Sequence, residues 1–83
     1  MKKFKMNKEK IIKVFAGNIR AERARNCYTQ ESLAEKADIS TEYVTKIEKE
    51  KYNPTLAVAV NLAAALGVTL DTLVPPELYL NKK

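Results

Sequence analysis

The chain has 83 residues, enough for one small domain with a modest core, and its 15 Lys and Arg against 10 Asp and Glu give a net charge of +5. One Cys and no His argue against a disulfide framework, a zinc site or histidine-based catalysis, and favour a reducing compartment. The longest apolar stretch, 56–68, is too short to span a bilayer, and no signal peptide is evident, so we expect a cytoplasmic protein without metal, cofactor, membrane partner or enzymatic activity.

The positive charge is concentrated at the N-terminal end. Residues 1–28 contain nine Lys and Arg against two Glu, whereas residues 29–53 are slightly acidic. A basic face of this kind suits phosphate binding, in which released counterions dominate the affinity. The alternative is that these lysines only keep the protein in solution.

The apolar spacing predicts a first helix from about Asn7, its N-cap, to about Asn26. Thr29 and Ser40 are N-cap residue types that begin two more helices, and their close spacing leaves room for little but a tight turn. Small or apolar residues recur at helical spacing on both sides of this turn, from 30 to 49. This pattern is typical of a helix-turn-helix, which presents its second helix to a DNA groove.

Two helices are expected after this pair. Thr55 is the N-cap of a fourth helix that ends at Gly67, and Thr69 is the N-cap of a short fifth helix. Pro75 and Pro76 are expected to stop regular structure. The fourth-helix residues expected to face the core are Leu56, Val60, Ala63 and Leu66. The chain then divides into a basic arm at 1–6, a helical domain at 7–74 and a tail at 75–83.

Six short motifs stand at fixed separations along these helices. They are IRxxR at 19–23, TQxxLA at 29–34, IS at 39–40, IE at 47–48, NPT at 53–55 and LAxALGV at 62–68. Jointly they resemble the Cro/cI-type (XRE-type) helix-turn-helix family of bacterial and phage transcriptional regulators. The resemblance implies an all-α, five-helix, lambda-repressor-like DNA-binding domain.

The chain departs from this family at three turns. Members often carry glycine where this chain has Cys27, Asp38 and Glu50. A left-handed backbone would cost Cys27 and Glu50 about 1 kcal/mol each unless a neighbour such as Asn26 takes the turn instead, while Asp38 tolerates it better. The departures bear on loop geometry and leave the expected fold unchanged.

The third helix carries the residue types that read bases. Lys46 can reach guanine O6 and N7, the threonines can donate, accept or touch a thymine methyl, and Glu42 can accept from cytosine N4. The alternative is an ordinary solvated face of an amphipathic helix. The residues expected to contact base edges are Thr41, Glu42, Thr45 and Lys46.

Phosphate contacts are expected around this helix. Gln30 is the first residue of the second helix, where free N–H groups and the positive helix end favour an anion; alternatively it is only a capping-turn residue. For Arg20 and Arg25 a solvated surface is the alternative. The other residues expected to contact phosphate are Arg20, Arg23, Arg25, Tyr43, Lys49 and Lys51.

Arg23 and Glu48 are expected to form an ion pair. Arg23 continues the apolar stripe of the first helix, so its guanidinium needs a partner. The family resemblance implies a bidentate bridge to Glu48 that orients the third helix. The alternative is two separate surface charges.

The apolar C-terminal residues predict a dimer contact around a two-fold axis, or else a tail that folds back on its own domain. The residues expected in this contact are Leu73, Val74, Leu78, Tyr79 and Leu80. The expected function is sequence-specific binding of double-stranded DNA as a homodimer on a pseudo-palindromic operator, most simply as a repressor. The alternatives are an antitoxin of a toxin–antitoxin operon, and an adaptor that uses the same fold to bind the transcription machinery or another protein.

Overall fold

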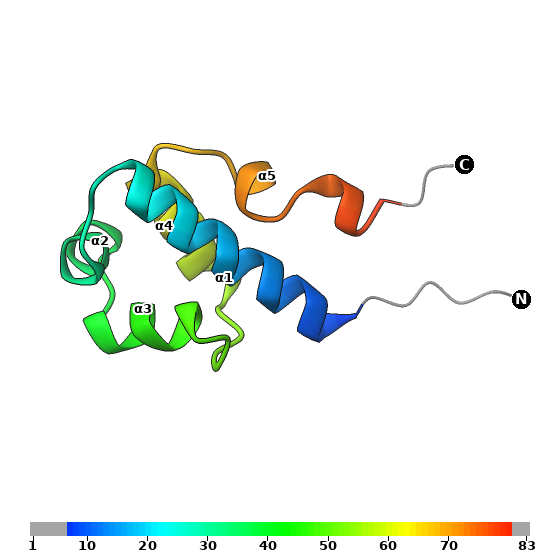
Figure 1. Ribbon diagram of the computed structural model, residues 1–83, viewed down its shortest axis with the longest axis horizontal. Helices are drawn as coiled ribbons and strands as arrows, with labels where there is room; N and C mark the ends of the chain where they lie inside the picture. Colours follow the sequence, from blue (N-terminus) through cyan, green and yellow to red (C-terminus); the bar gives the residue numbers. More distant parts are fainter. Residues whose placement is uncertain (1–6, 81–83) are drawn as a thin grey trace, which may run out of the picture.

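The computed structural model describes residues 7–80, which form five α-helices and one 3-10 helix and contain no strand (Figure 1). The helices are α1 (Lys8–Arg25), α2 (Gln30–Ala37), α3 (Thr41–Glu48), α4 (Leu56–Leu66), α5 (Leu70–Leu73) and the 3-10 helix η1 (Pro76–Leu78). The expected all-α, five-helix class is therefore confirmed. The basic arm at 1–6 and the last three residues of the tail lie outside the described residues.

Side-chain caps fix where the first four helices begin. Asn7 Oδ1 accepts from the Lys10 amide at 3.0 Å, and Ser40 Oγ accepts from the Tyr43 amide at 3.0 Å. Thr29 forms a capping box with Ser32, in which each side chain bonds to the other's backbone N–H. Such caps stabilise a helix by about 1 kcal/mol, because they satisfy N–H groups that have no partner within the helix. Thr69 precedes α5 but makes no capping bond.

Left-handed residues other than glycine follow three of these helices, and Gly67 ends α4 in the same conformation. Among the described residues, Cys27, Asp38 and Glu50 are the non-glycine residues with positive φ, at 60°, 60° and 64°. Each lets the next amide reach back to a carbonyl in the last turn, as the Tyr28 amide does to the Arg23 carbonyl at 3.0 Å. The chain therefore keeps the glycine-type turns of the family at the cost of backbone strain.

The core lies where α1, α2, α3 and α4 meet, and α5 closes one side of it. α1 runs through the middle of the molecule, with α2 and α3 together at one end of the view (Figure 1). The buried apolar residues of this core are Phe15, Ala16, Ile19, Leu33, Ala34, Ala37, Val44, Ile47, Leu62, Ala63, Leu66 and Leu73.

The inward face of α4 differs from the expected one. Leu56 and Val60 are 73% and 44% exposed, whereas Leu62 is fully buried beside Ala63 and Leu66. The sequence of α4, LAVAVNLAAAL, is apolar on nearly every side, so its spacing does not select one face. The neighbouring helices select it instead, and they leave Leu56 and Val60 at the surface.

The chain after α5 also differs from expectation. Pro75 and Pro76 do not stop regular structure: the Leu78 amide donates to the Pro75 carbonyl at 2.9 Å and begins a 3-10 turn. Proline suits this position because its fixed φ is helical and the first amides of a turn need no partner.

Candidate nucleic-acid interface

α3 has one face in the core and one at the surface. Val44 and Ile47 are 0% and 1% exposed, and they anchor the helix in the core, where α3 packs against α1 and α2. The opposite side carries Thr41, Glu42, Thr45 and Lys46, which we call the reading face. Thr41 and Glu42 are exposed, while Thr45 and Lys46 are half-buried.

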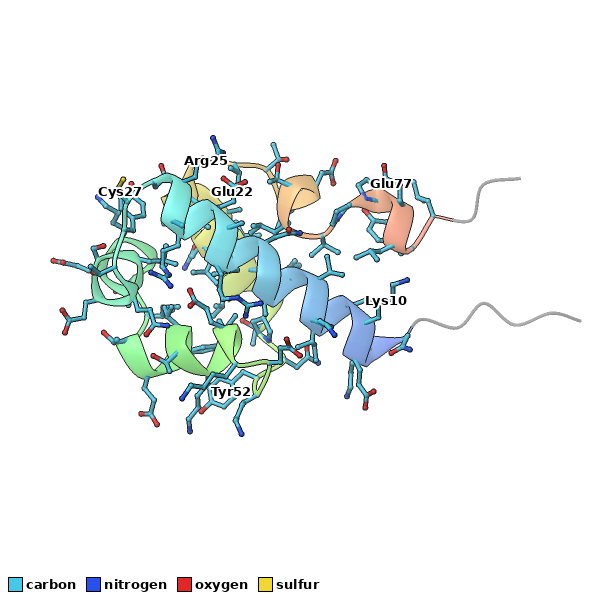
Figure 2. All side chains as sticks on the ribbon, in the orientation of Figure 1. Lys10, Glu22, Arg25, Cys27, Tyr52 and Glu77 are labelled. Atoms are coloured by element: carbon cyan, nitrogen blue, oxygen red, sulfur yellow. The ribbon has the colours of Figure 1, made fainter. Side chains whose placement is uncertain are left out.

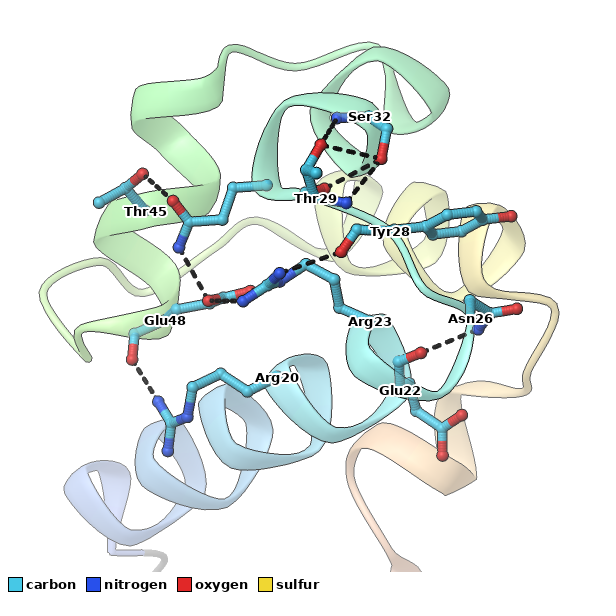
Figure 3. A network of polar contacts seen from close by, with 10 residues as sticks. Arg20, Glu22, Arg23, Asn26, Tyr28, Thr29, Ser32, Thr45 and Glu48 are labelled. Carbon is cyan, nitrogen blue, oxygen red and sulfur yellow. Dashed lines mark hydrogen bonds and ion pairs between the residues drawn. The ribbon is translucent and has the colours of Figure 1, made fainter.

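Glu48 joins the end of α3 to α1. Its side chain is 4% exposed, and its two carboxylate oxygens accept from Arg23 Nε at 2.7 Å and Nη2 at 3.1 Å. Arg23 Nη1 also donates to the Tyr28 carbonyl at 3.0 Å, and Arg20 donates to the Glu48 backbone carbonyl. Figure 3 shows both arginines reaching from α1 to this one residue. The bidentate geometry fixes the position of α3 relative to α1.

Gln30 extends these contacts to α2. Its Nε2 donates to Glu48 Oε1 at 2.9 Å, and its Oε1 accepts from Thr45 Oγ1 at 2.9 Å. Arg23, Glu48, Gln30 and Thr45 thus form one chain of hydrogen bonds across α1, α2 and α3 (Figure 3), which we call the polar chain. The two threonines of the reading face therefore differ, because Thr45 belongs to the polar chain and Thr41 does not.

Lys46 has two partners, the Glu42 carboxylate and the Tyr52 ring. Its Nζ lies 3.2 Å from the Glu42 carboxylate and 5.4 Å from the centre of the Tyr52 ring. The Tyr52 ring packs edge-on against Tyr43, with their centres 5.1 Å apart. The hydrogen bond with Glu42, together with the charges of Tyr52 and Glu42, raises the pKa of Lys46 above its ordinary value of 10.5. Lys46 is therefore a cation at any physiological pH.

The other residues expected at phosphates are distributed unequally. Tyr43 is half-buried on α3, and Lys49 and Lys51 are exposed just after this helix. Arg25 differs, because it pairs with Glu22 on its own helix at 2.5 Å, and Figure 2 places both on the edge of the molecule opposite α3. The structure thus does not bring Arg25 to the surface that α3 forms.

The residues expected at a dimer contact also need a correction. Leu73 is fully buried, and its carbonyl accepts from the Asn18 side chain at 2.9 Å, so it belongs to the core and has no surface to offer a partner. Val74 and Leu78 are half-buried, while Tyr79 and Leu80 are 39% and 56% exposed.

Two features of the site could not be found by sequence reasoning. Tyr52 lies after α3 and belongs to none of the sequence motifs, but it contacts both Tyr43 and Lys46. The bond between Gln30 and Thr45 joins two residues expected to contact DNA separately. Both depend on how α3 meets its neighbours, for which the linear sequence has no signal.

Over residues 7–80, no group of three or more His, Cys, Asp or Glu side chains is placed to hold a metal ion. Within the same part of the chain, no helix has the length and apolar character needed to cross a membrane.

Comparison with known proteins gives consistent matches. A family model described as Helix-turn-helix (HTH_3) matches residues 19–73. The immunity repressor protein of Bacillus phage phi105 is 37% identical over 65 residues, covering 78% of this chain and 45% of that protein. The chain spans 45% and 61% of the lengths of two curated relatives that it matches.

Solved structures agree with these matches. The hypothetical transcription factor NHTF from Neisseria superposes with a TM-score of 0.76 and 30% identity, covering 93% of this chain and 92% of that one. The restriction-modification controller protein C.AhdI from Aeromonas hydrophila gives a TM-score of 0.73 and 27% identity, covering 75% of this chain and 94% of that one.

Proposed function

Because the chain belongs to the HTH_3 (XRE-type) helix-turn-helix family, we propose that it is a DNA-binding transcriptional regulator without enzymatic activity, and that it is a cytoplasmic repressor that binds a pseudo-palindromic operator as a homodimer. The family membership confirms the resemblance inferred from the sequence motifs. The similarity to a phage immunity repressor supports repression as the mode of action.

The observation that carries the proposal is the reading face, held in a fixed orientation. Val44 and Ile47 anchor α3 from the core side, and Glu48 ties its end to α1 and α2. Thr41, Glu42 and Lys46 are then presented outward with side chains that match base edges in the major groove. We infer that α3 enters this groove as the recognition helix.

Groups around α3 suit the DNA backbone. Gln30 Nε2 has two hydrogens and gives one to Glu48, so the second is available to a phosphate at the start of α2. Arg20 lies exposed beside Glu48, and Lys49 and Lys51 follow α3. We propose these residues, with Arg23 and Tyr43, as phosphate contacts that position α3 without reading sequence.

We further propose that the dimer contact includes Leu56 and Val60, which we call the apolar patch. Leu56 borders a groove of about 180 Å³ whose lining includes Ile11, Ile12 and Val74. An exposed apolar ridge beside an apolar groove is self-complementary across a two-fold axis, because each copy can place its ridge in the other's groove. Tyr79 and Leu80 are exposed and remain proposed members of the dimer contact, whereas Leu73 is fully buried in the core.

The apolar patch also supports the alternative of a protein-binding role, as an antitoxin or an adaptor. Exposed Leu56 and Val60 would serve a different protein as well as a second copy. An adaptor of this kind would not select a DNA sequence, so sequence selection separates it from the proposed repressor.

The test is selection of binding sites from randomised double-stranded DNA by the full chain, followed by footprinting on the selected site. We expect two inverted half-sites whose centres lie about one helical turn, or roughly 10 base pairs, apart. Sedimentation of the free protein should give a dimer. Absence of any enriched sequence would contradict sequence-specific binding, and a single asymmetric half-site bound by a monomer would contradict the dimer alone.

A further inference from the structure

We propose that Thr45 determines specificity by acting only as a hydrogen-bond acceptor, and that it reads the exocyclic amino group of one base, adenine N6 or cytosine N4. This inference rests on the proposed function and specifies the chemistry at one position of the reading face. It follows from the direction of the hydrogen bonds in the polar chain.

The ion pair of Arg23 and Glu48 fixes which groups donate and which accept along the polar chain. The Arg23 guanidinium can only donate, and the Glu48 carboxylate paired with it can only accept. The atom of Gln30 that lies 2.9 Å from Glu48 Oε1 must therefore be the amide nitrogen. This settles which end of the Gln30 amide faces which neighbour, a choice that the amide itself leaves open.

The remaining end of that amide is its oxygen, which can only accept. Thr45 Oγ1 lies 2.9 Å from it, so the Thr45 hydroxyl must donate there. A hydroxyl has one hydrogen and two lone pairs. With its hydrogen given to Gln30, Thr45 can offer DNA only a lone pair.

This restricts the bases that Thr45 can bond. In the major groove, guanine N7 and O6 and thymine O4 are acceptors, whereas adenine N6 and cytosine N4 carry donor hydrogens. A lone pair facing an acceptor is repulsive, so the polar chain selects the amino-bearing bases. Thr41, one turn earlier on α3, is exposed and outside the polar chain, so its hydroxyl can rotate to donate or accept.

The first experiment is a double-mutant cycle that removes the Thr45 hydroxyl from the protein and one exocyclic amino group from the DNA, separately and together. Operators from the site selection are remade with one amino group deleted at a time, with purine for adenine in one arm and 2-pyrimidinone for cytosine in the other. At one position we expect the deletion to weaken binding by the wild type about threefold to tenfold, the range of one hydrogen bond. With Thr45→Val, which has the same shape without the hydroxyl, that deletion should have no further effect. Thr41→Val is the matched control and should retain the loss.

The second experiment frees the Thr45 hydroxyl to donate a hydrogen bond to DNA. Gln30→Met removes the acceptor while keeping a similar length, so the Thr45 hydrogen becomes free to donate. At the position found in the cycle, the preference for an amino-bearing base over guanine or thymine should fall at least about threefold, as expected for the loss of one discriminating hydrogen bond. A purely structural role for Gln30 would weaken all sequences equally. Melting of each variant shows that it is folded, and the Thr45→Val cycle stands independently of Gln30→Met.

The outcomes separate this inference from the proposed function. If the wild type selects no sequence, both fail together. If it selects an operator but no amino deletion is coupled to Thr45→Val, the inference alone is wrong. Coupling of Thr45 to guanine or thymine oxygens would overturn the acceptor-only assignment directly.

Discussion

The surface formed by α2 and α3 and the surface formed by the start of α4 use opposite kinds of side chain. On α3 the residues of the reading face are polar, and two have partners within the chain, because Lys46 pairs with Glu42 and Thr45 donates to Gln30. On α4 the exposed residues Leu56 and Val60 are aliphatic, and Leu56 lines an apolar groove.

The two surfaces therefore obtain binding precision by different means. Hydrogen bonds are directional, so a polar surface that reads bases must have its side chains oriented before binding. Apolar contact depends on area and shape, so the apolar patch needs only exposure and a complementary partner. A substitution on one surface should therefore leave the binding function of the other unchanged.

The largest effect is expected from Arg23→Ala. It leaves the 4% exposed Glu48 carboxylate without its cation, so the free energy of unfolding should fall by about 2–4 kcal/mol, and DNA affinity should fall with it. Arg25→Ala is the control, because its pair with Glu22 involves a side chain that is 68% exposed and should contribute about 0.5 kcal/mol or less. Denaturant unfolding of both variants measures the difference. If Arg23→Ala and Arg25→Ala had the same free energy of unfolding, the ion pair of Arg23 and Glu48 would contribute no more than a pair of surface charges.

Leu56→Glu should act on the apolar patch alone. Placing a charge in a buried contact should weaken the dimer by about 2–3 kcal/mol, roughly the value of burying one leucine, while the fold is kept because Leu56 is 73% exposed. Sedimentation over a range of concentrations measures the dissociation constant. Asn61→Glu adds the same charge to an exposed position on α4 and should leave the dimer intact. If the dissociation constant of the dimer is unchanged in Leu56→Glu, the dimer contact does not include Leu56.

Lys46→Ala should act on the reading face alone. We expect operator binding to weaken by about 1–2 kcal/mol and the base preference at one position to relax, with no change in melting temperature. Lys36→Ala is a matched control, because Lys36 also lies over a tyrosine ring, at 5.2 Å from Tyr28, but is on α2. Binding assays on the selected operator and on single-base variants measure both quantities, and a uniform loss over all sequences would make Lys46 a phosphate contact.

The binding contributed by Lys46 should also be constant between about pH 6 and 9. Its pKa is raised above 10.5 by Glu42 and Tyr52, so the cation is retained throughout this range and is lost only as the pH rises beyond that value. Titration of operator affinity against pH, with Lys46→Ala as the reference, checks this. If the difference in operator affinity between the wild type and Lys46→Ala became smaller as the pH rose from 6 to 9, this prediction would be wrong.

The smallest effect concerns the turns that hold the two surfaces in place. Cys27→Gly should raise the free energy of unfolding by about 0.5–1 kcal/mol, because φ of 60° strains a residue with a side chain. Gly67→Ala is the converse test: φ is 72° there, and an added Cβ would meet nothing within 4 Å, so backbone strain alone should destabilise the chain by about 1 kcal/mol. Thermal melting should show shifts of opposite sign.

Local features of the fold could be predicted from the sequence because their causes lie within a few residues. The N-caps at Asn7, Thr29 and Ser40 bond to amides three residues ahead, and the structure has them at these positions. The exposed face of α4 could not be predicted, because a helix that is apolar on most sides has no preferred side until its neighbours are known.

In the site, too, the features with local causes could be predicted, and those that depend on contacts between helices could not. The polar and apolar sides of α3 follow from helical periodicity, so the buried positions of Val44 and Ile47 agree with the sequence pattern. The difference between Arg20, which reaches Glu48, and Arg25, which pairs with Glu22, depends on the rotation of α1 against α3. The contact of Thr45 with Gln30 likewise depends on where two helices meet.

The turn after α1 gives the protein a built-in position for a spectroscopic probe. Cys27 is the single cysteine of the chain and is exposed, so a thiol-reactive nitroxide or fluorophore attaches at one defined place without any engineered residue. Because the turn is short and follows an 18-residue helix, the probe would report the position of a rigid body. Two labelled copies bound to one operator would then give an inter-probe distance that measures how the DNA spaces them.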